Sequence, residues 1–298
     1  MNGRGAGRDP PPPPPQAETA NASDTAIALV ARNRVRIFTI TPAQAAENTQ
    51  LPLIRLSPSK AFIFLKMVNR LRPKTDMDPR FDHIRDWIFD LDNCLYPASA
   101  GLFELIDERM GAYIQRLLDC DPLEARRVQK HHFHTHGTTL AGLMKEHGVD
   151  PHDFLGDVHA IPLDRVCRDD RLSAMLGRLP GRKFVFTNGD AYYATRVLEA
   201  LGVHQQFDEL HDIHASDLQP KPNPHGYRLL CDRFGIDPAR ALLADDMAQN
   251  LMPAKALGMT TIWVDNGSER GSHGAGEFID HRIESVSDWL EQVVGGQE

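Results

Sequence analysis

Residues 86–97 read DWIFDLDNCLYP and are the strongest indication of the fold. Residues 87–91 form a short apolar run, which is typical of a buried strand in a parallel sheet. Two carboxylates, Asp90 and Asp92, stand two positions apart where the strand gives way to a loop, so both can face one crevice. Such acids can serve as nucleophile or metal ligand and as proton donor. Aspartate is also common in ordinary turns, so this pair needs support from the rest of the chain.

Further apolar runs repeat the pattern at residues 183–187, 241–245 and 260–264. They are continuous rather than alternating, as in strands that helices cover on both faces. Asn223-Pro224 has the residue types of an N-cap and a first helical proline. Glycines that can end helices follow apolar helical stretches at Gly202, Gly235 and Gly258. This succession predicts an α/β fold, a doubly wound Rossmann-like parallel sheet formed by residues 77–96 and 171–298.

Residues 97–170 interrupt the alternation and have the pattern of helices only. Apolar residues recur at helical spacing from Phe103 to Leu117. Asp121-Pro122 and Asp150-Pro151 each combine an N-cap with a first helical proline. In doubly wound sheets, ligands bind beyond the carboxyl ends of the strands, which is where this insertion begins. We therefore expect residues 97–170 to form an all-helical cap over the site.

Residues 1–76 have the composition of a disordered or weakly ordered N-terminal extension. Six prolines in a row, residues 10–15, precede a polar stretch, and neither can build a packed core. Residues 32–40 have the pattern of a strand and residues 60–71 that of a short amphipathic helix, but neither has an obvious partner in the sequence.

Composition and charge exclude several classes of protein. The extension carries 11 Lys/Arg against 5 Asp/Glu, whereas residues 77–298 carry 22 against 36. Such an acidic body does not favour binding of a nucleic-acid polymer, which needs clustered cations. No apolar run approaches the roughly 20 residues that span a bilayer, so no membrane partner is expected. Four scattered cysteines indicate neither a zinc site nor disulfides and favour the cytoplasm. The oligomeric state cannot be read from the sequence.

Polar residues also end the second and third strands of the predicted sheet. Thr187 and Asn188 follow the second strand, where a hydroxyl and loop amides can hold phosphate oxygens. Asp245 and Asp246 end the third, and adjacent like charges are costly unless a cation neutralises them. Mg²⁺ prefers carboxylate, water and phosphate oxygens. Taken singly, a common turn and an acidic helix N-terminus are the simpler interpretations of these motifs.

Lys221 stands among three prolines in the segment QPKPNP, residues 219–224. The prolines stiffen the backbone, which a solvated surface lysine does not need. A lysine that holds a phosphoryl group and shields it from a carboxylate nucleophile benefits from this frame. Acid pair, hydroxyl, lysine and second acid pair follow one another along the chain, and together they predict an active site.

These four motifs resemble those of the haloacid-dehalogenase superfamily of aspartate-nucleophile hydrolases, over roughly residues 84–290. Within that superfamily, residues 89–97 (FDLDNCLYP) and residues 136–143 (HGTTLAGL) are similar to the pyrimidine 5′-nucleotidase group.

The resemblance implies a role for each motif. Asp90 would attack phosphorus and form an aspartyl-phosphate, and Asp92 would protonate the leaving group and then activate water. Thr187 and Lys221 would neutralise the transferring oxygens. Mg²⁺ would be held by Asp90, the backbone carbonyl of Asp92, Asp246 and, directly or through water, Asp245. Asn250 stands at a supporting position that the family often fills with Asp.

Four histidines stand within six residues near the end of a predicted cap helix: His131, His132, His134 and His136. Positions i and i+2 do not share a helix face, which disfavours a shared metal site. His136, Thr138 and Thr139 are the candidates for contacting the leaving group of the substrate.

We therefore expect a Mg²⁺-dependent phosphatase that acts on a small phosphorylated metabolite, a nucleoside 5′-monophosphate in the first instance and a pyrimidine one by resemblance. A broad phosphatase for sugar phosphates or other metabolites is the alternative within the class. A non-catalytic phosphate-binding or scaffold protein is the alternative outside it, and the complete set of acids and lysine argues against that alternative. Asp92 argues against dehalogenation, because a halide leaves without a proton.

Overall fold

The computed structural model describes residues 77–267, 271–272 and 276–294, together with the backbone of three strands in the extension. Two compact units, residues 1–73 and 74–298, are described separately below. The helix expected over residues 60–71 lies outside the described residues, as does most of the extension, so the expectation of weak order there stays a prediction.

The extension contains a three-stranded antiparallel sheet in the order β2-β1-β3. Its strands are β1 (Thr25–Ala31), β2 (Arg34–Ile40) and β3 (Ile54–Leu56). The strand expected over residues 32–40 is thus present and has a partner, in contrast to the sequence-based expectation. The partner was missed because β1 lies close behind a polar stretch and its small apolar residues give a weak pattern.

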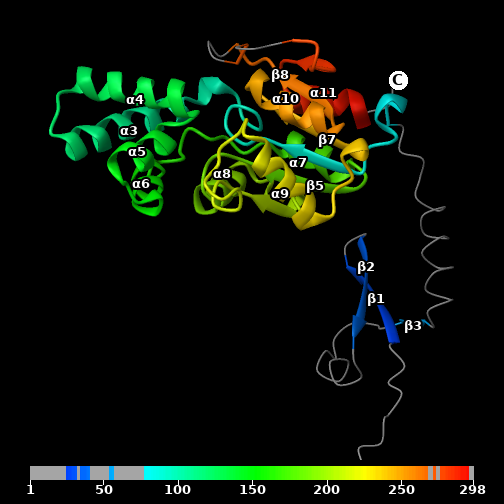
Figure 1. Ribbon diagram of the computed structural model, residues 1–298. Helices are drawn as coiled ribbons and strands as arrows, with labels where there is room; N and C mark the ends of the chain where they lie inside the picture. The colour runs from blue at the N-terminus through cyan, green and yellow to red at the C-terminus, as the bar shows by residue number, and fades with distance from the viewer. Residues whose placement is uncertain are drawn as a thin grey trace, which may run out of the picture. The chain divides into compact units, whose positions relative to one another are not determined.

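The second unit is built on a six-stranded sheet in the order β6-β5-β4-β7-β8-β9, and every neighbouring pair is parallel (Figure 1). The strands are β4 (Asp86–Phe89), β5 (Arg182–Phe186), β6 (Glu209–His211), β7 (Ala241–Asp245), β8 (Thr260–Val264) and β9 (His281–Ile283). The predicted parallel α/β fold is confirmed, although Asp90 and Leu91 follow β4 rather than belong to it. The short edge strands β6 and β9 carry no periodic signal and were not predicted.

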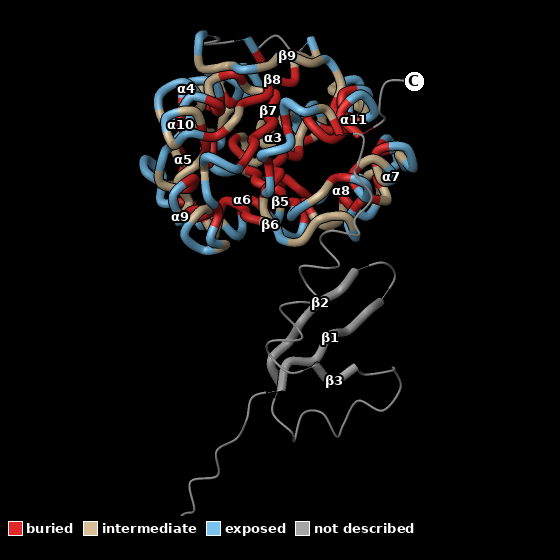
Figure 2. Tube along the Cα trace, turned by 90° about the vertical axis from the view of Figure 1, so that its right-hand side faces the viewer, coloured by how far each residue is buried: buried red, intermediate tan, exposed pale blue. Residues whose placement is uncertain are grey.

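Helices cover both faces of this sheet, as the continuous apolar strands predict. Trp87 and Phe89 pack in one buried cluster with α7 (Asp170–Arg178), α8 (Ala191–Leu201) and α11 (Val286–Val294). On the other face, Ile88 packs with α9 (Pro224–Phe234) and α10 (Ala248–Leu257). Figure 2 shows the resulting buried strands at the centre of this unit.

The predicted helix signals lie where they were expected. The side chain of Asn223 accepts a hydrogen bond from the backbone of His225 at the start of α9. Gly202, Gly235 and Gly258 end α8, α9 and α10 in the left-handed conformation. Among the described residues, no helix has the length and apolar character needed to cross a membrane.

Residues 97–170, all of which are described, contain helices and no strand. The four α-helices of this insertion are α3 (Leu102–Leu118), α4 (Pro122–His136), α5 (Thr139–His147) and α6 (Pro151–Val158). They pack on one another and lie to the left of the sheet in Figure 1. We propose that they form the cap.

The order in which successive strands are added to the sheet changes direction at β4. From β4 the strand order runs through β5 to β6, and it then restarts on the other side of β4 with β7. Such a switch point opens a crevice at the carboxyl ends of the two strands. Asp90 follows β4 and Asp245 ends β7, so both acids stand at that crevice.

Gly181 sets the start of β5 beside β4. Its φ is 89°, and an added Cβ would lie 2.1 Å from the carbonyl oxygen of Arg85. That same oxygen accepts a hydrogen bond from the backbone of Arg182 at 2.9 Å. We expect Gly181→Ala to lower the free energy of unfolding by about 1–3 kcal/mol or more, measured by urea denaturation.

Gly111→Ala is the matched control, because Gly111 lies within α3 and an added Cβ there would meet nothing within 4 Å. It should be neutral or stabilise by up to about 1 kcal/mol. Equal unfolding midpoints for the two variants would contradict the close approach at Gly181.

Candidate active site

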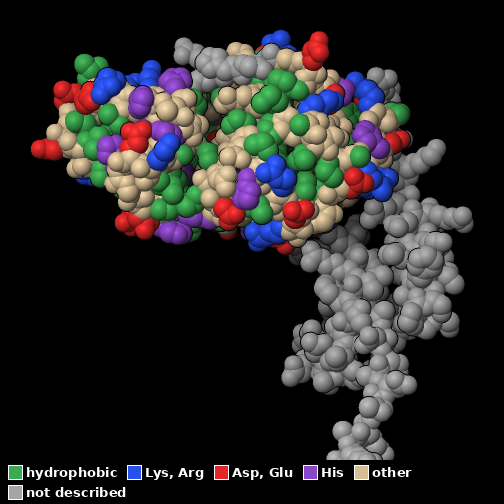
Figure 3. Space-filling view, viewed as in Figure 1, with side chains coloured by type: hydrophobic (Ala, Val, Ile, Leu, Met, Phe, Trp, Pro, Cys, Tyr) green, Lys and Arg blue, Asp and Glu red, His purple; other side chains and the backbone are tan. Residues whose placement is uncertain are grey.

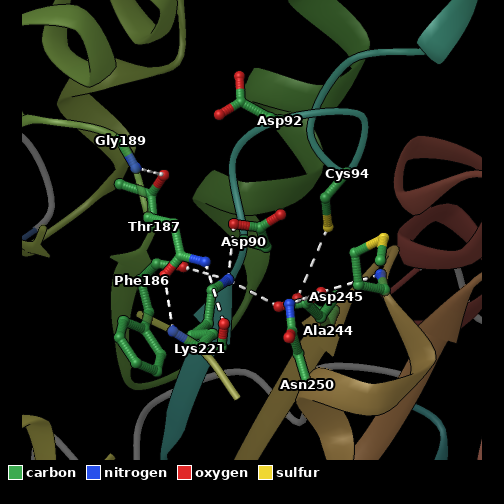
Figure 4. A network of polar contacts seen from close by, with 12 residues as sticks. Asp90, Asp92, Cys94, Phe186, Thr187, Gly189, Lys221, Ala244, Asp245 and Asn250 are labelled. Atoms are coloured by element: carbon green, nitrogen blue, oxygen red, sulfur yellow. Dashed lines mark hydrogen bonds and ion pairs between the residues drawn. The ribbon is translucent and has the colours of Figure 1, made fainter. Parts of the chain in front are cut away.

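Lys221 joins the ends of three strands through its buried ammonium group. Its Nζ donates to Oδ1 of Asp90 and to Oδ2 of Asp245, each at 2.7 Å, and to the carbonyl oxygen of Phe186 at 2.9 Å (Figure 4). Burial disfavours the charged ammonium, but the attraction of Asp245 and Asp90 outweighs burial and raises the pKa of Lys221. The lysine is therefore held as a cation between two of the predicted site acids.

The backbone places these side chains where they meet. The amide of Asp90 donates to the carbonyl of Ala244 at 2.8 Å, which sets the end of β4 against β7. The side chain of Asn188 accepts from the amide of Lys221 at 2.8 Å and donates to its carbonyl at 3.3 Å. Asn188, which we expected at the phosphate, thus uses its side-chain amide to fix the loop that carries Lys221.

Three buried carboxylates, Asp90, Asp245 and Asp246, each offer an oxygen within 4.8 Å of the others. Burial raises the pKa of Asp90, and the attraction of Lys221 offsets this only in part. Burial, followed by the charges of Asp90 and Asp245, raises the pKa of Asp246. Three acids against one ammonium leave an excess of negative charge in a buried place, and hard oxygen donors of this kind fit Mg²⁺.

Asp245 differs from the other two acids because both of its oxygens already have partners. Oδ1 accepts from the amide of Met247 at 2.9 Å and from the side chain of Asn250 at 2.8 Å, and Oδ2 accepts from Lys221. The side-chain amide of Asn250 therefore holds one oxygen of Asp245. We therefore propose that Asp90 and Asp246 are the direct cation ligands and that Asp245 acts through water.

Thr187 is buried directly after β5. Its Oγ1 accepts a hydrogen bond from the amide of Gly189 at 3.0 Å, and its own amide donates to the carbonyl of His211 at 3.0 Å. Figure 4 shows this hydroxyl turned toward the amide of Gly189. The tight turn thus presents an O–H group at the same edge of the sheet as the acids.

Asp92 is separated from the ammonium and is held by two tyrosines that sequence reasoning missed. The hydroxyls of Tyr96 and Tyr193 donate to its Oδ1 at 2.5 and 2.8 Å. Burial is the main cause that raises the pKa of both tyrosines, so both stay protonated and act as donors. Tyr96 stands four residues after Asp92 in the same loop, but Tyr193 comes from α8 and meets Asp92 only through packing.

His159 and Asp190 extend this group. The His159 ring stacks on Tyr193 with centroids 4.4 Å apart, and its Nδ1 contacts a carboxylate oxygen of Asp190. His159 and Asp190 also line a cavity of about 730 Å³ between α6 and α8, together with His152, Tyr192, Arg196 and His214. The contacts of Asp92 therefore extend through Tyr193 and His159 to the wall of a cavity.

The predicted cap residues make their described contacts within the cap. Nε2 of His136 lies 2.8 Å from Oε1 of Glu146, and Oγ1 of Thr138 accepts from the amide of Ala141 at 3.1 Å. Thr139 is buried at the start of α5. A Cβ added to the neighbouring Gly137 would lie 3.9 Å from Pro220, so this segment adjoins the loop of Lys221.

Cys94 is buried, and its Sγ contacts the carbonyl of Ala244 at 3.6 Å. Burial raises the pKa of its thiol, which suits packing and not nucleophilic attack.

Comparisons with known proteins identify the family and the fold. A profile of the haloacid dehalogenase-like hydrolases matches residues 87–258. Phosphate metabolism protein 8 of Saccharomyces cerevisiae is 26% identical over 191 residues, which cover 58% of this chain and 59% of that protein. Phosphoglycolate phosphatase of Rhodospirillum rubrum is 27% identical over 224 residues, which cover 68% of this chain and 89% of that protein.

Among solved structures, the HAD phosphatase from Thermococcus onnurineus superposes with a TM-score of 0.51 at 17% identity. The match covers 72% of this chain and 99% of that one, and it shows a shared fold.

The buried acids predict a pH-dependent effect of divalent cations on stability. The raised pKa values of Asp90 and Asp246 mean that the folded chain binds more protons than the unfolded chain above about pH 4. Without a cation, the free energy of unfolding contributed by these groups therefore falls as pH rises. A cation offsets this loss, so Mg²⁺ should raise Tm more at about pH 8 than at about pH 5.

Thermal unfolding in Mg²⁺ and in EDTA measures this difference. Asp246→Asn, which removes one of the acids, is the control and should lose most of the effect of Mg²⁺. Equal Mg²⁺ effects at the two pH values would contradict the assignment.

Proposed function

Because the chain belongs to the haloacid dehalogenase-like hydrolase family, we propose that it is a Mg²⁺-dependent phosphatase that hydrolyses small phosphate monoesters. The observation that carries this proposal is the ammonium of Lys221 between Asp90 and Asp245 with Asp246 beside them, at the switch point of the sheet. An acid nucleophile, a fixed cation and a site for a divalent ion are what transfer of a phosphoryl group requires.

The proposed reaction has two steps that reuse the same two acids. A carboxylate oxygen of Asp90 attacks phosphorus and forms an aspartyl-phosphate, while the bond to the leaving oxygen breaks and Asp92 gives that oxygen a proton. Asp92 then takes a proton from water, which attacks phosphorus and releases phosphate and the free Asp90. When bound, Mg²⁺ supplies positive charge beside the transferring oxygens.

The surroundings of the two acids support this division of roles. Asp90 contacts a cation, which suits a nucleophile that must approach an anionic phosphoryl group. Asp92 is oriented by two neutral hydroxyls, which suits a group that must gain and lose a proton. The hydroxyl of Thr187 and the ammonium of Lys221 neutralise the transferring oxygens.

We also propose which organic group the phosphate ester carries. We propose a nucleoside 5′-monophosphate, on the resemblance of residues 89–97 and 136–143 to pyrimidine 5′-nucleotidases. The cavity between α6 and α8 supports a substrate larger than phosphate alone, because it has room for one and presents imidazoles and Arg196. The phosphoglycolate phosphatase among the relatives favours a small phosphorylated acid as the second candidate.

We further propose a cytoplasmic location, because Cys94, Cys120, Cys167 and Cys231 are all free thiols.

Asp90→Asn tests the nucleophile. We expect release of phosphate from p-nitrophenyl phosphate to fall to background, because an amide cannot form the acyl-phosphate bond. The variant should be as stable as the parent or more so without Mg²⁺, because it removes a buried like charge. Activity retained in the folded variant would reject the mechanism. A panel of pyrimidine and purine 5′-monophosphates, phosphoglycolate and sugar phosphates then ranks substrates by kcat/KM.

Tyr193→Phe tests the orientation of Asp92. We expect kcat for an alkyl phosphate to fall by about tenfold or more, which is part of the roughly 10²- to 10⁴-fold that a general acid contributes. The loss should be smaller for p-nitrophenyl phosphate, because its leaving group needs little protonation. Tyr113→Phe is the matched control, since Tyr113 lies in α3, packs on Phe154 and is not among the residues that line the cavity. Equal losses on both substrates would contradict a role through Asp92.

A further inference from the structure

His132 is a buried imidazole whose two ring nitrogens have no hydrogen-bond partner among the described residues. It lies in α4 and is only 1% exposed. Buried polar atoms are nearly always paired, and leaving one unpaired costs about 1–3 kcal/mol, so such a residue calls for an explanation. An ion bound at the ring is one of the groups that can supply the missing partner.

Groups that bind metal ions surround this ring. His131, His132 and Glu146 each offer a donor atom within 4.8 Å of the others. Nδ1 of His132 lies 3.7 Å from Oε1 of Glu146, the same oxygen that contacts Nε2 of His136 at 2.8 Å. The ring of His147 lies 5.6 Å from that of His132. Figure 3 shows histidine side chains gathered over the cap helices.

The two helices bring together residues that the sequence pattern kept apart. His132 and His136 are one turn apart on α4 and share a face, whereas His134 points elsewhere. Glu146 and His147 come from the end of α5, which packs against α4. The spacing of histidines along α4 disfavours a metal site on α4 alone, whereas the fold adds donors from α5.

Packing alone does not explain the imidazole. A Cβ added to Gly142 of α5 would lie 2.3 Å from Cγ of His132, so the backbone of α5 approaches the ring closely. An apolar side chain would fill this position without leaving two nitrogens unpaired. A ring so tightly enclosed is also held in one orientation, as a metal ligand must be.

We propose that His132 and Glu146, with His131 or His136, form a binding site for a borderline divalent transition cation such as Zn²⁺. Imidazole nitrogens with one carboxylate are the donor set that Zn²⁺ takes, and water can fill the remaining position. This set differs from the oxygen donors of Asp90, Asp245 and Asp246. The proposal does not depend on the proposed phosphatase activity.

Such a cation would tie the end of α4 to the end of α5. The segment between them includes Gly137, which adjoins Pro220 next to Lys221. The site would therefore hold the cap loop that faces the candidate active site in one position.

Zn²⁺ titration of the full chain, without a polyhistidine tag and in excess Mg²⁺ to fill the carboxylate site, tests this proposal by calorimetry. We expect one Zn²⁺ per chain and a rise in Tm. Glu146→Gln, at a side chain 41% exposed, should weaken Zn²⁺ binding about tenfold or more and leave the fold intact. His132→Gln should do the same, and the Co²⁺ absorption spectrum should change in that variant because one of its nitrogen ligands is lost.

His134→Gln is the matched control, because His134 is exposed on the same helix, and it should bind Zn²⁺ as the parent does. The proposal fails if the parent takes up no Zn²⁺ in excess Mg²⁺. It also fails if Glu146→Gln, folded by circular dichroism, binds Zn²⁺ with the affinity of the parent.

Discussion

The buried ammonium of Lys221 is the constraint on which the arrangement of the site depends. A charge taken out of water is tolerated only when it is paired and hydrogen-bonded, and here two carboxylates and a carbonyl oxygen meet that need. Those oxygens belong to the ends of β4, β5 and β7, so the three strands must finish level with one another. The side-chain amide of Asn188 bonds to the backbone of Lys221 and so fixes the path of the loop that carries this lysine. The geometry of the sheet and that of the site are therefore set together.

The same cluster carries more negative than positive charge, and this imbalance links stability to chemistry. Asp90 and Asp246 resist ionisation in the bare site, so the folded chain gains from any cation that enters. Asp92 adds to this negative charge, and it is oriented by Tyr96 and Tyr193. Two aspartates separated by one residue thus have different surroundings, which is how one short loop can provide both a nucleophile and a proton carrier.

Most of the central strands and several site residues could be predicted from the sequence. The features that could not be predicted are either strands too short to show a period or contacts that form only when helices pack. β7 and β8 lie within the predicted bounds, because long buried runs between clear helix signals leave little freedom. β6 and β9 have three residues each, too few to show a period. Asp90, Lys221 and Asp246 were identified from local motifs. Tyr193 was missed because it meets Asp92 only when α8 packs, and His159 because it meets Tyr193 in the same way. Glu146 comes close to His132 only when α5 folds back on α4.

The insertion of α3–α6 directly after the central strand has a consequence for how the chain folds. Asp86 in β4 pairs with Arg182, 96 residues later, and Cys94 just beyond β4 contacts Ala244, 150 residues later. The helices between them contact mainly their neighbours along the chain. Contacts between residues close in sequence form faster than distant ones, because closing a short loop loses less entropy. The inserted helices can thus assemble while the central strand still lacks both of its partners, and the slow event is the closure of the sheet around β4.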